Sequence, residues 1–224
     1  MENIKIISTK PLLQVALDYT DLVGATEMLN KIKNEVDIVE AGTPLLKSEG
    51  VKNVLPAFRE ITKKPLVADL KAADVADIEF EVAAANYAKY VTVLASSPLE
   101  NIKDGLESAR KNNMILVADL LGVENYCSRA QELVRLGVPY IGLHCGISEQ
   151  RQGKNIFTKT REVSEAITGL GGKIIVAGGI NNDNIDQLTD IQNIAIIIVG
   201  GGITRVEDPV GAAKNLKNKI NSIF

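Results

Sequence analysis

Apolar residues along the chain gather in short runs rich in β-branched side chains, which is typical of strands buried on both faces. The runs are 12–18 (LLQVALD), 36–41 (VDIVEA), 65–70 (PLVADL), 90–95 (YVTVLA), 114–120 (MILVADL), 140–144 (YIGLH), 173–179 (KIIVAGG) and 195–201 (AIIIVGG). Between them, apolar residues recur with helical spacing in 21–35, 77–88, 99–112, 124–137 and 208–220. The pattern therefore predicts strands and helices in alternation.

Alternation of this kind requires parallel pairing with right-handed crossovers, and eight such units close most economically into a (β/α)8 TIM barrel of the α/β class. The open doubly wound sheet is the alternative, but no GxGxxG motif follows the first strand and no acidic residue stands in the ribose-binding place. An internal repeat supports the barrel, because VADL at 67–70 recurs at 117–120. Since alternate strands fill the same interior layer, Asp69 and Asp119 are predicted to lie at corresponding heights.

Length and composition fit one large globular domain, predicted to span 1–224, because 46% of the 224 residues are hydrophobic and 24% are charged. The formal net charge of -3 and the pI of about 5.4 argue against bulk nucleic acid or an anionic membrane as the partner, and favour a small ligand. The N-terminus resembles no secretion signal, and no apolar run approaches the length of a membrane span. We expect a cytoplasmic enzyme or binding protein.

Ionisable residues stand at the ends of five of the predicted strands. They are Asp18, Glu40, Asp69 with Lys71, Asp119 and His144. The carboxyl ends of barrel strands meet around one mouth, where catalytic groups come from several strands. Carboxylates gathered there repel one another unless a cation or a substrate offsets their charge. Together these residues indicate an active site.

The acidic residues of the second and third strands form a pair of hard oxygen ligands. Glu40 and Asp69 suit one Mg²⁺, which takes one or two carboxylates and completes its shell with water and substrate oxygens. Lys71 is placed to stabilise negative charge on an enediolate, with Asp74 keeping it protonated and oriented. The alternative is a salt-bridged strand end, followed by Asp77 as the cap of the next helix.

His144 is the only histidine of the chain, so the paired-histidine metal site of other phosphosugar barrels cannot form. Its place at the end of a strand favours a proton-transfer role over that of a core residue. The two cysteines have neither CxxC spacing nor enough partners for a disulfide framework. Cys127 is predicted to pack on a helix face, whereas Cys145, beside the histidine, is left open as a pocket residue.

Glycines follow the seventh and eighth strands, where barrels of this type bind phosphate through backbone N–H groups and a short helix N-terminus. They are Gly178 and Gly179, and the run at 200–202. Tight turns need glycine too, so each run alone is weak evidence, but two of them at these strand ends favour a phosphate site. Thr204 is a candidate hydroxyl donor, and Arg205 is a candidate solvated surface charge.

The ordered set of motifs resembles one known family over essentially the whole chain. The motifs are LQVALD, VDIVEAGTPLLKSEGV, VADLKAAD, VTVLA, VADLLGV, YIGLHCGI, VAGGI and IIVGGGITRVEDPVGAA. They are similar to the 3-hexulose-6-phosphate synthases of the orotidine monophosphate decarboxylase superfamily. Glu40 stands where the orotidine phosphate decarboxylases have Lys, which indicates the Mg-dependent branch. Ile147 and Asp119 stand where the 3-keto-L-gulonate-6-phosphate decarboxylases of that branch have Arg and usually Glu, which favours the synthases.

The resemblance implies a ribulose-phosphate-binding barrel that catalyses the reversible, Mg-dependent aldol condensation of formaldehyde with D-ribulose 5-phosphate through an enediolate. It implies that Glu40 and Asp69 hold Mg²⁺, that Lys71 stabilises the enediolate, and that His144 with Asp119 moves the proton at C1. It also implies a homodimer in which Asp74 reaches the partner's site. Asp18 would contact sugar hydroxyls, and Gly178, Gly179, Gly201 and Gly202 would hold the phosphate.

The sequence departs from the synthase pattern close to these residues. Around the lysine the usual order is D-x-K-T-M-D-x-G, whereas this chain has Ala72, Ala73 and Ala76, and Ser148 replaces a common Asp. We expect these changes near the reacting carbons, where they would mark a divergent synthase, a changed substrate or lost activity. The alternatives are therefore 3-keto-L-gulonate-6-phosphate decarboxylase, an orotidine 5'-monophosphate decarboxylase-like enzyme, or a phosphosugar-binding barrel without turnover.

Overall fold

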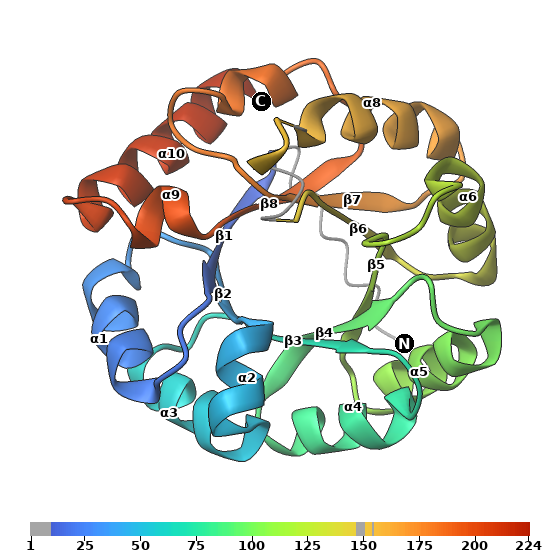
Figure 1. Ribbon diagram of the computed structural model, residues 1–224, viewed down its shortest axis with the longest axis horizontal. Helices are drawn as coiled ribbons and strands as arrows, with labels where there is room; N and C mark the ends of the chain where they lie inside the picture. The colour runs from blue at the N-terminus through green and yellow to red at the C-terminus, as the bar shows by residue number, and fades with distance from the viewer. Residues whose placement is uncertain (1–9, 147–150, 154) are drawn as a thin grey trace.

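Eight parallel strands form a closed barrel in chain order, with helices around its outside (Figure 1). The computed structural model describes residues 10–146, 151–153 and 155–224. The strands are β1 (Leu12–Leu17), β2 (Ile38–Ala41), β3 (Leu66–Ala72), β4 (Ala88–Leu94), β5 (Ile115–Asp119), β6 (Tyr140–His144), β7 (Lys173–Ala177) and β8 (Ile194–Val199). β8 pairs with β1 to close the ring. The predicted (β/α)8 barrel is confirmed, with each strand inside or within two residues of its predicted range.

The helices lie between successive strands and cover the outside of the barrel. They are α1 (Leu22–Ile32), α2 (Thr43–Glu49), α3 (Val51–Ile61), α4 (Ala76–Ala85), α5 (Leu99–Lys111), α6 (Tyr126–Leu136), α8 (Ile156–Ile167), α9 (Gly201–Thr204) and α10 (Pro209–Ile223), with a 3₁₀ turn at Ile185–Leu188. The five predicted helical segments correspond to α1, α4, α5, α6 and α10.

Two separate apolar clusters show how the strands divide their side chains. Alternate strand residues face the helices and join the large outer cluster, as Val39, Ala68 and Val91 do. The others face the interior of the barrel, where a smaller cluster takes one buried residue from each of seven strands: Ile38, Val67, Tyr90, Val117, Tyr140, Ile175 and Ile196. The rings of Tyr90 and Tyr140 meet edge to face, with centroids 6.1 Å apart. We call this smaller cluster the barrel floor.

Polar residues follow the barrel floor at the next inward-facing position of several strands. Two residues after Ile38, Val67, Tyr90 and Val117 come Glu40, Asp69, Thr92 and Asp119, and all four are buried. Because side chains alternate along a strand, each pair points into the same interior with the polar member nearer the carboxyl end. Because side chains on one face of a strand recur every two residues, a polar layer lies next to the apolar floor, nearer the carboxyl ends of the strands.

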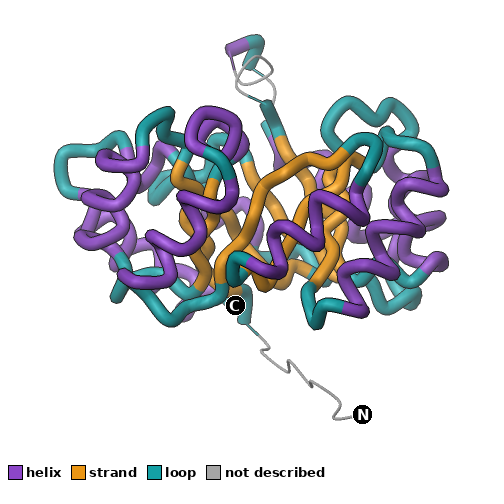
Figure 2. Tube along the Cα trace, turned by 90° about the horizontal axis from the view of Figure 1, so that it is seen from below, coloured by secondary structure: helices purple, strands orange, loops and turns teal. Residues whose placement is uncertain are grey.

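The outward faces of the helices are mostly polar, as α3 illustrates. Val54, Leu55 and Phe58 of that helix are fully buried against the barrel, whereas Lys52 and Glu60 are exposed. In side view the helices flank the strands as an outer layer (Figure 2). In the part of the chain that the structure describes, no helix is both long and apolar enough to cross a membrane.

Candidate active site

The carboxyl ends of the strands surround a cavity of about 580 Å³. Ten of the predicted site residues line it: Asp18, Glu40, Asp69, Lys71, Asp119, His144, Gly178, Gly179, Gly201 and Gly202. These residues come from seven different strand ends, spread over most of the sequence. The closed barrel therefore brings together in one place what the sequence distributes along the chain.

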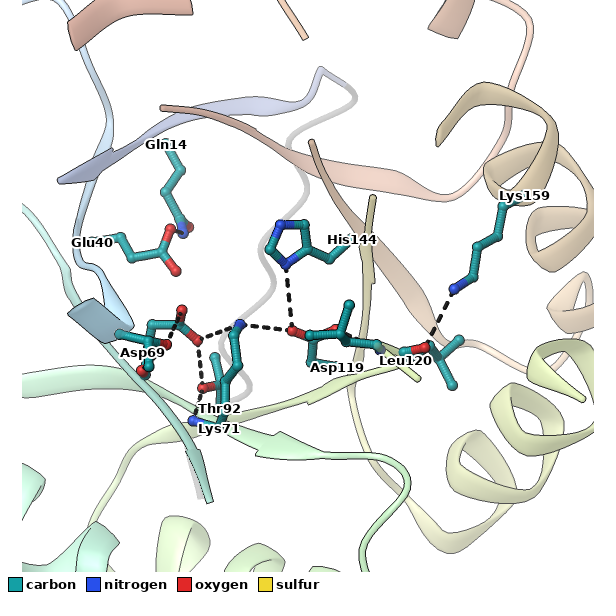
Figure 3. Close-up of polar contacts among 11 residues, drawn as sticks. Gln14, Glu40, Asp69, Lys71, Thr92, Asp119, Leu120, His144 and Lys159 are labelled. Atoms are coloured by element: carbon teal, nitrogen blue, oxygen red, sulfur yellow. Dashed lines mark hydrogen bonds and ion pairs between the residues drawn. The ribbon is translucent and has the colours of Figure 1, made fainter. Parts of the chain in front are cut away.

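The Lys71 ammonium lies between two buried carboxylates from different strands (Figure 3). Its Nζ is 3.0 Å from Asp69 Oδ1 on β3 and 2.9 Å from Asp119 Oδ2 on β5. Burial alone would lower the pKa of Lys71, but Asp69 and Asp119 outweigh that effect and raise the pKa above its ordinary value. Lys71 is thus a fixed cation at neutral pH, and it joins the Asp residues of the two VADL segments.

His144, at the end of β6, points towards Asp119 (Figure 3). Its Nδ1 is 4.0 Å from Asp119 Oδ2, the same oxygen that contacts Lys71. The imidazole is about one-third exposed and lines the cavity. This arrangement leaves part of the imidazole open to the cavity, while the Asp119 carboxylate lies beside its Nδ1.

Asp69 accepts hydrogen bonds on both carboxylate oxygens. Thr43 donates to Oδ2 over 2.7 Å, while Thr92 and Lys71 donate to Oδ1 over 2.8 and 3.0 Å. Burial would raise the pKa of Asp69, but the Lys71 charge and these hydrogen bonds prevail and hold the pKa below its ordinary value. Asp69 is therefore ionised and fixed in orientation.

Glu40 is the acid with the least compensation in the cavity. Among the described residues its only hydrogen-bond partner is Gln14, whose Nε2 donates to Oε2 over 2.8 Å. Burial, followed by the like charges of Asp69 and Asp18, raises the pKa of Glu40 well above its ordinary value. Asp18 keeps contact with solvent at the mouth, yet partial burial and Asp69 also raise its pKa. The like charges of these acids make it costly to ionise all of them together unless an opposite charge offsets them.

Glu40 and Asp69 offer carboxylate oxygens, the kind of ligand that Mg²⁺ takes. Within the described ranges, no group of three or more His, Cys, Asp or Glu side chains is arranged as a metal site. Mg²⁺ does not need such a group, because one or two carboxylates suffice when water and substrate oxygens complete the octahedron. Glu40 Oε1 accepts no hydrogen bond from a described residue, and Asp69 is ionised. The pair fits Mg²⁺ on these grounds.

A bulge in β3 turns Lys71 towards the cavity. Ala68 pairs with Val91 of β4 and Ala72 pairs with Val93, so residues 69–71, three in number, lie opposite Thr92 alone. Lys71 adopts a left-handed backbone with φ of 47°, which is uncommon for a residue other than glycine. Strain of this kind persists only where surrounding contacts hold it, and it often accompanies a functional side chain.

The glycines of the seventh strand end are required by the backbone. Gly178 and Gly179 have φ of 104° and 74°, in the left-handed region that favours glycine. A Cβ at Gly178 would clash with the Cys145 carbonyl oxygen, so β6 and β7 approach closely there. Gly202, in α9, faces the Ile180 carbonyl across the loop, where a Cβ would lie 2.7 Å away. Backbone therefore forms this side of the cavity.

Sequence comparison places the chain among known proteins. Residues 11–216 match the family described as Orotidine 5'-phosphate decarboxylase / HUMPS. The chain belongs to this family. A 3-hexulose-6-phosphate synthase from Staphylococcus aureus (strain bovine RF122 / ET3-1) is 37% identical over 208 residues, which are 93% of this chain and 98% of the relative.

Solved structures of Orotidine 5'-phosphate decarboxylase / HUMPS proteins share the fold. The 3-hexulose-6-phosphate synthase from Salmonella typhimurium superposes with a TM-score of 0.90 at 27% identity, covering 95% of this chain and all of the other. KGPDC from Streptococcus mutans, in a structure with a bound ligand, gives a TM-score of 0.87 at 27% identity, covering 96% and 99%. The predicted resemblance to the synthases is therefore confirmed.

Asp74 is the predicted site residue that the structure does not bring into the cavity. Its side chain is exposed, and Lys71 is held instead by Asp69 and Asp119. The prediction that Asp74 orients Lys71 within one chain is therefore wrong, because the bulge turns the ammonium towards β5. Of the alternative, the salt-bridged strand end is present, but the prediction that Asp77 caps the next helix is wrong. Val75 is the N-cap of α4, and Asn101 Oδ1 accepts from the Ala76 N–H.

The three alanines that depart from the synthase pattern do not line the cavity. Ala72 is buried and pairs with Val93 beyond the bulge, and Ala76 is buried at the start of α4 beside Gly105. Ala73 is exposed. The expectation that these changes lie near the reacting carbons is therefore wrong for the alanines. The predictions on Ile147 and Ser148 lie outside the described residues.

Five residues of the site were not predicted from the sequence: Gln14, Thr43, Thr92, Asn181 and Arg205. Gln14, which pairs with Ile38 across β1 and β2, and Thr92, in the polar layer, hydrogen-bond to the predicted acids, and their strand positions were the available signal. Arg205, considered a surface charge, lines the cavity with Asn181. The Thr204 hydroxyl, considered a ligand donor, instead donates to the Gly200 carbonyl over 3.2 Å.

A second cavity of about 600 Å³ lies beyond His144, between the loop that follows β5 and the start of α8. Cys145 lines this second cavity, so the residue that the sequence left open as a pocket residue does line a pocket. Cys127, by contrast, is partly buried on α6 and packs against the outer apolar cluster, as predicted.

Proposed function

We propose that this protein is a 3-hexulose-6-phosphate synthase, which condenses formaldehyde with D-ribulose 5-phosphate in a reversible, Mg-dependent aldol reaction in the cytoplasm. The observation that carries the proposal is the Lys71 ammonium, which bridges Asp69 and Asp119 beside His144 in one cavity. The 37% identity to a Staphylococcus aureus synthase over nearly the whole chain supports the choice of reaction. The ligand-bound structure of the Streptococcus mutans KGPDC supports a small-molecule ligand.

The reaction makes one carbon–carbon bond. C1 of ribulose 5-phosphate loses a proton, and the electron pair left behind forms an enediolate with the C2 carbonyl. C1 then attacks the formaldehyde carbon, the C2 carbonyl forms again, and the formaldehyde oxygen takes up a proton. The former C2 becomes C3 of the six-carbon product, which is therefore a 3-hexulose 6-phosphate.

The side chains in the cavity have distinct tasks in this scheme. His144, with Asp119 behind it, moves the proton at C1. Lys71 stabilises the negative charge of the enediolate, since its ammonium is fixed in place before the reaction begins. Asp18 binds sugar hydroxyls at the mouth.

Glu40 and Asp69 are proposed as the residues that hold Mg²⁺. When bound there, the ion would polarise the substrate carbonyl and offset the like charges of the acids. Gly178 and Gly179, with Gly201 and Gly202, are proposed to bind the phosphate through backbone N–H groups.

A homodimer is part of the proposal. Asp74 is exposed, and nearby in the chain the apolar side chains of Val75 and Ile78 are 45% and 58% exposed. A second copy packed on this face would cover these side chains and bring Asp74 close to the partner's cavity. Sedimentation velocity of the parent and of Ile78→Asp tests this part, since a monomeric parent would contradict it.

The deciding experiment follows formaldehyde loss with purified protein, Mg²⁺ and ribulose 5-phosphate, alongside an EDTA control. Formaldehyde consumption that depends on the phosphosugar and stops with EDTA is the expected result. A parallel incubation with 3-keto-L-gulonate 6-phosphate tests for decarboxylation, which would assign the chain to that activity instead. No turnover of either substrate, with retained binding of ribulose 5-phosphate, would refute the synthase and leave a binding protein.

A further inference from the structure

Thr92 is buried on β4 at the one position that lies opposite three residues of β3. A bulge of this size leaves backbone groups of β3 without partners in the sheet. The N–H of Lys71 bonds to a side chain of β4, and the backbone of Lys71 is also in the left-handed conformation. Some contact has to hold this segment in place.

The Thr92 hydroxyl supplies that contact with both of its hydrogen-bonding functions. Its Oγ1 accepts from the Lys71 backbone N–H over 2.8 Å and donates to Asp69 Oδ1 over 2.8 Å. The same Asp69 oxygen accepts from the Lys71 ammonium over 3.0 Å. The contacts therefore form a closed ring that runs from the Lys71 backbone through Thr92 and Asp69 to the Lys71 ammonium (Figure 3).

We propose that Thr92 is a positioning residue of the active site, whose hydroxyl fixes the bulge and thereby sets the Lys71 ammonium between Asp69 and Asp119. A hydroxyl suits this place because it donates one hydrogen bond and accepts another, whereas a methyl group does neither. Without it the part-buried Lys71 N–H loses its partner, and the left-handed backbone loses the contact that holds it. The inference rests on the proposed function for the role of Lys71, but the geometry of the ring stands without it.

The test compares Thr92→Val, which keeps the shape and removes the hydroxyl, with Thr92→Ser, which keeps the hydroxyl. Supporting contacts of this kind cost about 10- to 100-fold in activity when removed. We expect Thr92→Val to lower kcat by that factor with KM for ribulose 5-phosphate unchanged, and Thr92→Ser to restore kcat. Should Thr92→Val melt too early for kinetics, Thr92→Ala should show the same loss of kcat.

A matched control separates positioning from stability. Thr160 on α8 is fully buried, and its hydroxyl donates to the Ile156 carbonyl over 2.8 Å, away from both strands of the bulge. Thr160→Val therefore removes a buried hydroxyl of similar kind. It should lower the melting temperature and leave kcat at the parent value.

A second readout does not depend on turnover. Hydrogen–deuterium exchange at the Lys71 amide should be faster in Thr92→Val than in the parent and in Thr92→Ser, and unchanged in Thr160→Val. If the parent lacks synthase activity but Thr92→Val still speeds this exchange, the inference that Thr92 holds the Lys71 backbone stands, and only the proposed reaction is refuted. Parent-like kcat and exchange in Thr92→Val would overturn the inference, as would equal loss of kcat in Thr92→Ser or in Thr160→Val.

Discussion

The two sides of the barrel mouth differ in what they present to a ligand. The strand ends of β2, β3 and β5 present charged side chains, each held by a specific partner, as Lys71 is held by Asp69 and Asp119. At the ends of β7 and β8, Gly178, Gly179 and Gly202 present main chain, and Asn181 and Arg205 are the polar side chains beside them. Under the proposed function, the charged side would change the substrate and the glycine side would hold it. Substitutions on the first should lower kcat, and those on the second should raise KM.

The largest effect is expected from Asp69→Ala on the charged side. The change removes a proposed Mg²⁺ ligand, leaves the Thr92 hydroxyl without its acceptor, and takes one of two acceptors from Thr43 and from Lys71. We expect kcat to fall by at least about 10³-fold, with loss of Mg dependence, in the formaldehyde assay. Asp186→Ala, which breaks the surface pair with Lys219, is the control. Full activity without Asp69 would rule out the metal assignment.

Lys71→Ala should have the next largest effect. Removal of a preorganised cation is expected to lower kcat about 10²-fold or more, while Mg²⁺ still binds. The lysine of an exposed pair, Lys111 with Glu81, offers Lys111→Ala as a variant that should retain full activity. Equal rates for Lys71→Ala and the parent would refute the stabilising role.

Gly178→Ala probes the glycine side. The added Cβ would clash with the Cys145 carbonyl and would occupy a left-handed backbone, at a cost of about 1–3 kcal/mol. We expect KM for ribulose 5-phosphate to rise about tenfold, the equivalent of 1.4 kcal/mol, with a smaller change in kcat. Gly169 also has a positive φ, of 80°, but a Cβ there would meet no atom within 4 Å, so Gly169→Ala separates the effect of backbone strain from that of the clash. A fall in kcat with KM unchanged would contradict the division between the two sides.

The smallest effect concerns stability, through Glu40→Gln. The raised pKa of Glu40 means that the folded chain resists its ionisation, so Glu40 lowers stability increasingly as pH rises above the ordinary value of 4.5. Without Mg²⁺, the variant should therefore have a higher melting temperature than the parent at pH 7.5. Each kcal/mol gained in the free energy of unfolding corresponds to about 2–4 °C. At pH 4 the variant and the parent should have the same melting temperature.

Added Mg²⁺ should raise the melting temperature of the parent at pH 7.5 and leave Glu40→Gln unchanged. Glu100→Gln, at an exposed helix position, is the control and should match the parent throughout. A variant that melts lower than the parent without Mg²⁺ would show that Glu40 stabilises the fold instead.

The barrel and most of its site were predictable because the spacing of apolar residues and the position of each strand end are local features of the sequence. Apolar β-branched runs marked all eight strands, and a residue two positions after an inward-facing apolar one has to face the same interior. Asp69 and Asp119 were thus placed correctly by the repeated VADL segment alone.

The errors and omissions come from contacts between strands, which no local pattern encodes. Asp74 was assigned to Lys71 because the two are three residues apart, but the bulge directs the ammonium towards Asp119, 48 residues later. The size of the bulge depends on the register with β4, so the role of Thr92 could not be read from YVTVLA. Arg205 lines the cavity only because β8 closes against β1.

The barrel floor has a consequence for how such a protein can diverge. On β2, β3 and β5 the residue that packs in the floor and the residue that faces the ligand are two positions apart, as with Val67 and Asp69. Mutation of the cavity-facing residue leaves the floor residue unchanged. The positions that stabilise the barrel are therefore separate from the positions that determine the reaction. A lineage can therefore exchange one catalytic repertoire for another at a few strand ends while each intermediate protein still folds.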